Sequence, residues 1–186
     1  MKTIEYSKIV CEELTRTLSA ISSEEAEELA DRIYSAKKIF VAGAGRSGFM
    51  MKAFAMRLMH MGFDSHVIGE TTTPNTEKGD ILLIGSGSGE TGSLAAIAKK
   101  AKSMGITLGL VTIFKSSTIG QLADVTVEIP APTPKVKQET GFQSIQPMGS
   151  LFEQSLLLFL DSVILRLMEK QHKDSNTMFT KHANLE

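Results

Sequence analysis

The chain has 186 residues, of which 42% are hydrophobic and 22% charged, and this balance excludes a disordered or collagen-like protein. The 20 Lys and Arg residues and 21 Asp and Glu residues leave a net charge of −1. The chain therefore lacks the excess of basic residues that would indicate a nucleic-acid partner. The single cysteine, Cys11, excludes a disulfide framework and a cysteine-rich zinc site.

The N-terminal segment lacks the apolar core of a signal peptide and carries Glu5, Glu12 and Glu13. The most apolar stretch, 151–168, is interrupted by charged residues such as Glu153 and Asp161, which indicates a buried helix rather than a membrane span. No two histidines have metal-ligand spacing on a helix. We therefore expect a cytoplasmic protein without a membrane partner or a bound metal.

Two helices are predicted at the N-terminus. The first covers the opening residues, with apolar side chains near one face at Ile4, Cys11, Leu14, Leu18 and Ile21. The second runs from Ser23 to about Ala36, because Ser22 and Glu25 form a capping-box pattern before it.

Short apolar runs that alternate with helical patterns follow. The strands are predicted at 38–42, 65–68, 80–85, 106–113 and 125–129, and the helices at 50–61, 94–104 and 150–171. A proline-containing loop is expected at 130–146 and a polar tail at 172–186. The alternation predicts an α/β fold with a doubly wound, mostly parallel five-stranded sheet flanked by helices. We expect a single domain over 1–186, with N-terminal helices at 1–36, the α/β core at 37–171 and the tail at 172–186.

Two of the predicted strands end in glycine-rich and serine-rich loops, at Gly43–Gly48 and Gly85–Gly92. Ligands of open parallel sheets bind beyond the carboxyl ends of the strands. Glycine lets backbone N–H groups approach a ligand closely, and the following helix N-terminus favours an anion. The hydroxyls of Ser86, Ser88 and Thr91 add directional donors. The pattern is typical of a phosphate-ester site, although these side chains could also cap the following helix.

Other interpretations of the loops remain open. GAGRSG matches the dinucleotide pattern G-x-G-x-x-G, and Glu70 lies where a ribose-binding acid would be expected. The hydroxyl-rich second loop and the lack of room for a substrate domain count against a nicotinamide site. No P-loop lysine pattern is present. Both loops could also be tight strand-to-helix turns without a ligand.

The segments IFVAGAGRSG and ILLIGSGSGET resemble the sugar isomerase (SIS) domain family. Three further segments resemble its 6-phospho-3-hexuloisomerase family: MRLMHMGF, QPMGSLFEQSLLLFLD and the terminal KHANLE. The resemblance covers nearly the whole chain. The terminal segment begins with Lys181 where arginine is expected, which keeps the charge but loses the planar fork.

The resemblance implies an intramolecular oxidoreductase that interconverts D-arabino-hex-3-ulose 6-phosphate and D-fructose 6-phosphate. It implies a place in the ribulose monophosphate route of formaldehyde fixation, beside a 3-hexulose-6-phosphate synthase as functional partner. It also implies that the enzyme needs no cofactor and no catalytic metal. The expected assembly is a homotetramer with active sites near subunit contacts.

Glu153 is the candidate catalytic base, because one carboxylate can carry a proton between two neighbouring carbons through an enediol. The pattern alone favours another role, since Ser150 and Glu153 form S-x-x-E before an apolar run, which is typical of a capping box. The resemblance favours catalysis. It also implies that His60 opens the sugar ring or contacts a hydroxyl, and that His182 docks at its own site or a neighbour's.

The candidate substrate-binding residues lie in the two loops. They are Arg46, Ser47 and Gly48 in the first, and Ser86, Gly87, Ser88, Gly89, Glu90 and Thr91 in the second. The charge of Glu90 would repel a phosphate, so the dipole of the following helix could also explain it. Arg46 could equally be a solvated helix-start residue.

A homo-oligomer is expected, because the Met-rich 50–61 helix and the 150–171 helix are apolar on most faces and need cover all round. Two alternatives to the hexulose phosphate reaction remain. The chain could be another phosphosugar aldose-ketose isomerase of this fold, or a non-catalytic sugar-phosphate sensor. The short, acidic N-terminal helices argue against the DNA-binding module that a regulator would need.

Overall fold

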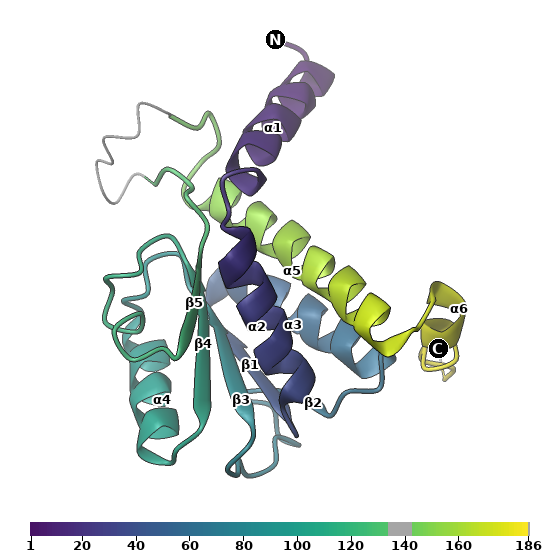
Figure 1. The fold of residues 1–186 in the computed structure, drawn as a ribbon. Helices are drawn as coiled ribbons and strands as arrows, with labels where there is room; N and C mark the ends of the chain where they lie inside the picture. The colour runs from purple at the N-terminus through teal and green to yellow at the C-terminus, as the bar shows by residue number, and fades with distance from the viewer. Residues whose placement is uncertain (134–142, 186) are drawn as a thin grey trace.

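The fold is a parallel sheet between layers of helices (Figure 1). The computed structural model describes residues 1–133 and 143–185. The strands pair in parallel in the order β2-β1-β3-β4-β5. They are β1 (Ile39–Gly43), β2 (Ser65–Val67), β3 (Ile81–Gly85), β4 (Thr107–Thr112) and β5 (Val125–Glu128). The predicted doubly wound sheet is confirmed.

Helices cover both faces of this sheet. They are α1 (Thr3–Leu18), α2 (Ser23–Ser35), α3 (Gly45–His60), α4 (Gly92–Ser103), α5 (Ser150–Gln171) and α6 (Ser175–Phe179). One core cluster joins the sheet to α2, α3 and α5. A second cluster joins the opposite face to α4. The long helix α5 crosses the sheet, with α6 beyond its end (Figure 1).

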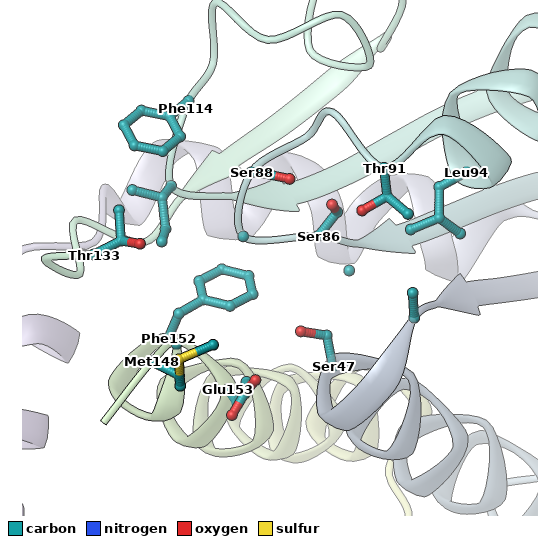
Figure 2. Close-up of a pocket in the computed structure, with 15 residues that line it drawn as sticks. Ser47, Ser86, Ser88, Thr91, Leu94, Phe114, Thr133, Met148, Phe152 and Glu153 are labelled. Atoms are coloured by element: carbon teal, nitrogen blue, oxygen red, sulfur yellow. The ribbon is translucent and has the colours of Figure 1, made fainter. Parts of the chain in front are cut away.

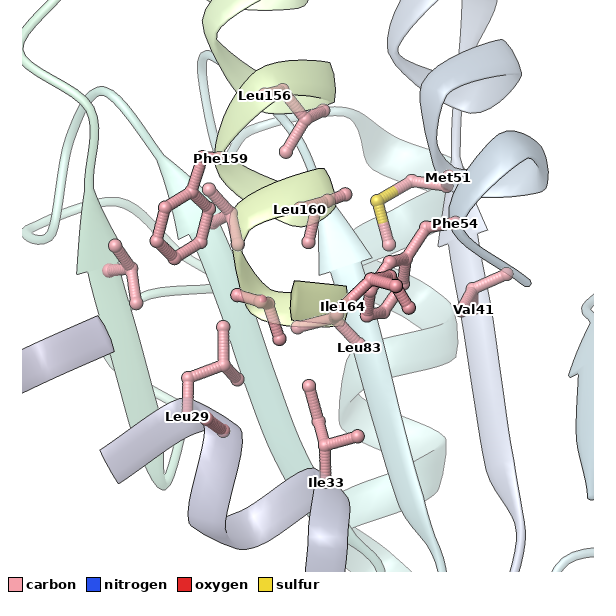
Figure 3. Packing of buried hydrophobic residues seen from close by; sticks show 14 of the residues in the cluster. Leu29, Ile33, Val41, Met51, Phe54, Leu83, Leu156, Phe159, Leu160 and Ile164 are labelled. Carbon is pink, nitrogen blue, oxygen red and sulfur yellow. The ribbon is translucent and has the colours of Figure 1, made fainter. Parts of the chain in front are cut away.

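The central strands are continuous apolar runs because both of their faces are buried. In β3, Ile81 and Leu83 point into the cluster under α5, whereas Leu82 and Ile84 point into the cluster under α4. Figure 3 shows Leu83 packed among side chains of α3 and α5, including Phe54 and Ile164. Burying one such side chain contributes about 1.5–3 kcal/mol, so these contacts fix the sheet between its helices.

Three local predictions differ from the structure. Helix α3 begins at Gly45 rather than at residue 50, because the loop glycines themselves continue into the helix before its apolar pattern starts. Along α1, Leu14 and Leu18 pack on the core, but Ile4 and Cys11 are exposed because the N-terminal half of α1 projects beyond the sheet (Figure 1). The polar tail contains α6, which is too short for its periodicity to be recognised.

The strand order places two loops side by side. The chain passes from β1 to β2 on one side and then returns to β3 on the other side of β1. Gly43 and Gly85 are register partners at the carboxyl ends of β1 and β3. Ligands of open α/β sheets bind at such a switch point. The predicted loop at 130–146 falls in part outside the described residues.

Candidate active site

A cavity of about 250 Å³ opens at the carboxyl ends of β1 and β3, where both glycine-rich loops meet the start of α5. Figure 2 shows the hydroxyls of Ser86, Ser88 and Thr91 on one side and Ser47 with Glu153 on the other. With Gly87, which also lines it, six residues predicted from three separate segments therefore meet at one cavity. Their chemistry combines neutral donors with a single carboxylate.

The loop after β3 is held by hydrogen bonds from its backbone N–H groups to the hydroxyls of Ser86 and Ser88. Ser86 Oγ accepts a hydrogen bond from the Gly89 N–H at 3.2 Å, and Ser88 Oγ accepts from the Glu90 N–H at 3.2 Å. Both hydroxyls can still donate their hydrogens to a ligand oxygen. Thr91 occupies the N-cap position of α4, but its side chain makes no capping hydrogen bond. The predicted capping role is therefore not seen for Thr91, and its hydroxyl lines the cavity instead.

Two predicted loop residues, Gly89 and Glu90, contact residues 117–118 rather than the cavity. Gly89 has φ +62°, and a Cβ there would lie 2.0 Å from Ser117 Oγ. Glu90 Oε1 accepts a hydrogen bond from the Thr118 N–H at 2.7 Å, and this bond holds the pKa of the Glu90 carboxyl below its ordinary value. Neither residue lines the cavity, whereas Gly87 does. Glu90 thus braces the loop against residues 117–118, and it lies just before the N-cap of α4 rather than in the first helical turn.

The loop after β1 brings α3 against the sheet. A Cβ on Gly48 would lie 2.8 Å from the Gly43 carbonyl oxygen, so only glycine allows the helix and strand to approach this closely. This packing turns Ser47 into the cavity. The Arg46 side chain reaches the start of α5, where its Nε lies 3.1 Å from Glu153 Oε2 and its Nη1 donates to Ser150 Oγ at 3.0 Å.

Glu153 projects from the first turn of α5 into the cavity (Figure 2), and its side chain is 17% exposed. The capping-box interpretation is wrong here, because Gly149 is the N-cap and Ser150 is already helical. The Ser150 hydroxyl accepts from Arg46 instead of from the helix N-terminus. The Glu153 carboxylate is therefore available to a ligand while Arg46 fixes its position.

His60 and His182 lie together in a different cavity, of about 410 Å³, beside the C-terminal end of α3. Their rings stack with centroids 5.5 Å apart. Burial lowers the pKa of His60, and electrostatic repulsion from Arg57 and His182 lowers it further. Within one chain, these histidines do not meet Glu153, since the two cavities share no lining residue.

Sequence reasoning missed the apolar part of the cavity wall. Phe152, Phe114 and Met148 line it together with Thr133 (Figure 2). Phe152 could have been inferred, because it precedes Glu153 at the start of the same helix. Phe114 and Thr133 carry no local motif, and only the packing of the chain brings them to the cavity.

The described residues contain neither a metal-binding cluster nor a membrane-spanning helix. Over 1–133 and 143–185, no group of three or more His, Cys, Asp or Glu side chains is arranged to hold a metal ion. No helix in the same ranges is long and apolar enough to cross a membrane.

The chain belongs to the SIS domain family, whose family model matches residues 32–158. A Bacillus subtilis 3-hexulose-6-phosphate isomerase is 55% identical over 186 residues, which covers both chains completely. A Mycobacterium gastri 3-hexulose-6-phosphate isomerase is 40% identical and covers 96% of this chain and 88% of its own length. A crystal structure of a Methanococcus jannaschii protein, for which a 3-hexulose-6-phosphate isomerase function was inferred, has a TM-score of 0.84 and 36% identity over 98% of this chain and 99% of its own.

Proposed function

We propose that this protein is a 3-hexulose-6-phosphate isomerase that interconverts D-arabino-hex-3-ulose 6-phosphate and D-fructose 6-phosphate. The observation that carries the proposal is the cavity in which Glu153 faces the hydroxyls of Ser86, Ser88 and Thr91. The 55% identity to the Bacillus subtilis isomerase supports the choice of substrate. The protein is an enzyme of the intramolecular oxidoreductase type.

The two sides of the cavity have separate roles. The phosphate of the substrate accepts hydrogen bonds from the Ser86, Ser88 and Thr91 hydroxyls, and the N-terminus of α4 adds a positive dipole end beside them. The sugar carbons then extend toward Ser47 and Glu153. Phe152 excludes water from this end of the cavity, which strengthens the electrostatic contacts of the reacting atoms.

Glu153 acts as the base. Its carboxylate removes the proton from C2 of the 3-ketose, the electron pair of that C–H bond forms the C2–C3 double bond, and the C3=O π pair moves onto O3 to give an enediolate. The same group then returns the proton to C3, while the hydroxyl proton on O2 moves to O3 and leaves the carbonyl at C2. No electron acceptor is required, because C2 is oxidised as C3 is reduced.

Glu153→Gln tests this mechanism. The amide keeps the shape of the side chain but cannot take up a proton, so kcat should fall by about 10²–10⁴-fold while substrate binding is retained. Glu169→Gln, an exposed change near the far end of α5, is the matched control. The assay supplies formaldehyde, ribulose 5-phosphate and an independent synthase, and reads fructose 6-phosphate. Unchanged turnover in Glu153→Gln would remove Glu153 as the base, and no turnover by the unaltered protein would remove the proposed function.

The proposed setting is the ribulose monophosphate route, in which a 3-hexulose-6-phosphate synthase supplies the substrate. We place the enzyme in the cytoplasm, because phosphorylated sugars are charged at neutral pH and do not cross membranes unaided. We also treat residues 1–186 as one SIS domain.

The proposed assembly is a homotetramer, in which His60 and His182 reach the substrate site of another copy. Apolar side chains near this pair support an interface, since Met56 and Met59 on α3 and Leu165 on α5 are 46%, 42% and 65% exposed. Solvent-facing methionine and leucine at this density need cover from another surface.

A further inference from the structure

A buried carboxylate on α1 holds a segment that is distant in the sequence. Glu13 is 6% exposed, although charged side chains are almost never buried without partners. Its Oε2 accepts hydrogen bonds from Ser144 Oγ at 2.7 Å and Gln146 Nε2 at 2.9 Å, and its Oε1 accepts from the Ile145 N–H at 2.8 Å. The three consecutive residues 144–146 thus all donate hydrogen bonds to the Glu13 carboxylate.

The held segment leads directly to the wall of the candidate active site. Met148 and Gly149, which follow it, line the cavity with Phe152 and Glu153. The far end of the segment is fixed independently, because the Ser150 N–H donates to the Pro147 carbonyl at 3.1 Å and α5 is anchored in the core. Residues 144–149 are therefore tied at one end by α5 and at the other by Glu13.

The anchor depends on the charge of Glu13. Burial raises the pKa of its carboxyl, but the hydrogen bonds from Gln146, Ile145 and Ser144 outweigh that effect and hold the pKa below its ordinary value. The ionised carboxylate offers only acceptor oxygens, which suits donors from three directions. A glutamine at this position would present two N–H donors of its own to the same groups, so one of the contacts would become repulsive.

We propose that Glu13 is a positioning residue for the isomerase site, which it serves by holding residues 144–149 so that Met148 and Gly149 close the cavity around the sugar. This inference rests on the proposed function. Glu13 does not touch the cavity, and it acts through the segment. The base on α5 keeps its own support from Arg46 and the core, so loss of the anchor should weaken substrate binding more than the chemical step.

Glu13→Gln separates these effects. We expect KM for the hexulose phosphate to rise by about tenfold, the cost of one hydrogen bond to a charged group, while kcat stays within about twofold. Amide hydrogen exchange at Ile145 should become faster, whereas exchange in the middle of α5 should not change. Glu12→Gln, on the exposed side of the same helix, is the matched control and should leave KM, kcat and exchange at their original values.

The outcomes are distinct. Unchanged KM in Glu13→Gln, or a loss of kcat alone, would overturn the positioning role even if Ile145 exchanges faster. If Glu13→Gln does not fold, Gln146→Leu removes one donor from the other side and should raise KM in the same direction, and an unchanged KM there would overturn the proposal. If the unaltered protein shows no turnover, the proposed function fails, and the exchange of Ile145 still decides whether Glu13 anchors the segment.

Discussion

At the scale of single residues, Arg46 and His60 show how charge is placed around the two cavities. Arg46 forms an ion pair with Glu153 and also donates to Ser150, so the carboxylate is oriented from outside the cavity. Arg46 is about half-exposed, and such a pair contributes at most about 1 kcal/mol to stability. Its significance therefore lies in the geometry of the carboxylate rather than in the folding of the chain.

The lowered pKa of His60 predicts that the free energy of unfolding falls as the pH is lowered. Because burial, Arg57 and His182 lower its pKa in the folded state, the unfolded chain binds this proton more readily. The stability that the neutral ring contributes is complete above about pH 6.5, the unperturbed value, and is lost as the pH falls through the lower folded pKa. Urea unfolding at pH 7.5 and 5.5 should show a decline that is smaller in His60→Gln. An equal decline in that variant would assign the acid sensitivity to another group, and His172→Asn controls for an exposed histidine.

At the scale of elements, the loop between β3 and α4 is braced against residues 117–118 by a close backbone approach. The Ile119 N–H donates to the Gly89 carbonyl at 3.1 Å, and Glu90 accepts from Thr118. The positive φ of Gly89 and its contact with Ser117 leave no room for a side chain. The positions of the Ser86 and Ser88 hydroxyls therefore depend on one glycine.

Gly89→Ala should destabilise the fold by roughly 2 kcal/mol or more, because the left-handed conformation and the contact with Ser117 both oppose a Cβ. KM should rise as well, since the loop that we propose binds the phosphate would shift. Gly92→Ala is the matched control. A Cβ there meets nothing within 4 Å, and alanine favours the first turn of α4. Urea midpoints would measure both variants, and equal midpoints would contradict the brace.

At the scale of the whole molecule, large apolar side chains are exposed on the two adjacent helices α3 and α5. Phe49, Met56 and Met59 on α3 and Leu165 on α5 all face solvent in the single chain. The N-terminal half of α1 likewise projects from the body with Ile4 exposed (Figure 1). These exposed side chains are the candidate contacts of the proposed homotetramer.

Met56→Glu combined with Leu165→Glu should reduce the mass of the proposed assembly, because two charges would be buried in the proposed interface without partners. Light scattering behind a sizing column measures the mass directly. Met104→Glu, at the C-cap of α4 on the opposite face, should leave the mass unchanged. An unaltered mass in the double variant would place the contacts between copies elsewhere.

The parts predictable from sequence are those set by local pattern. Strands such as β3 were predicted because burial on both faces makes them continuous apolar runs. The glycine and hydroxyl loops were predicted because their chemistry lies within a few residues. Six of the predicted site residues line the cavity, but whether they act as proposed is a question for the variants above.

The parts that escaped prediction depend on contacts between distant residues. Ser150 and Glu153 fit a capping box until Arg46, more than a hundred residues earlier, is brought against both. Glu13 looks like one more charge on an amphipathic helix, and its partners at 144–146 lie at the other end of the chain. No local pattern carries this information, because each contact joins residues more than a hundred positions apart.

Met148 has a strained backbone conformation that a glycine would adopt without strain. Its φ of 56° lies in the left-handed region, which is unfavourable by about 1–2 kcal/mol for a residue with a side chain. A glycine there would relieve that strain but would remove the thioether from the cavity wall. Selection for thermal robustness and selection for substrate contact therefore pull in opposite directions at this position. Position 148 is one at which a more heat-resistant relative would be expected to trade one property for the other.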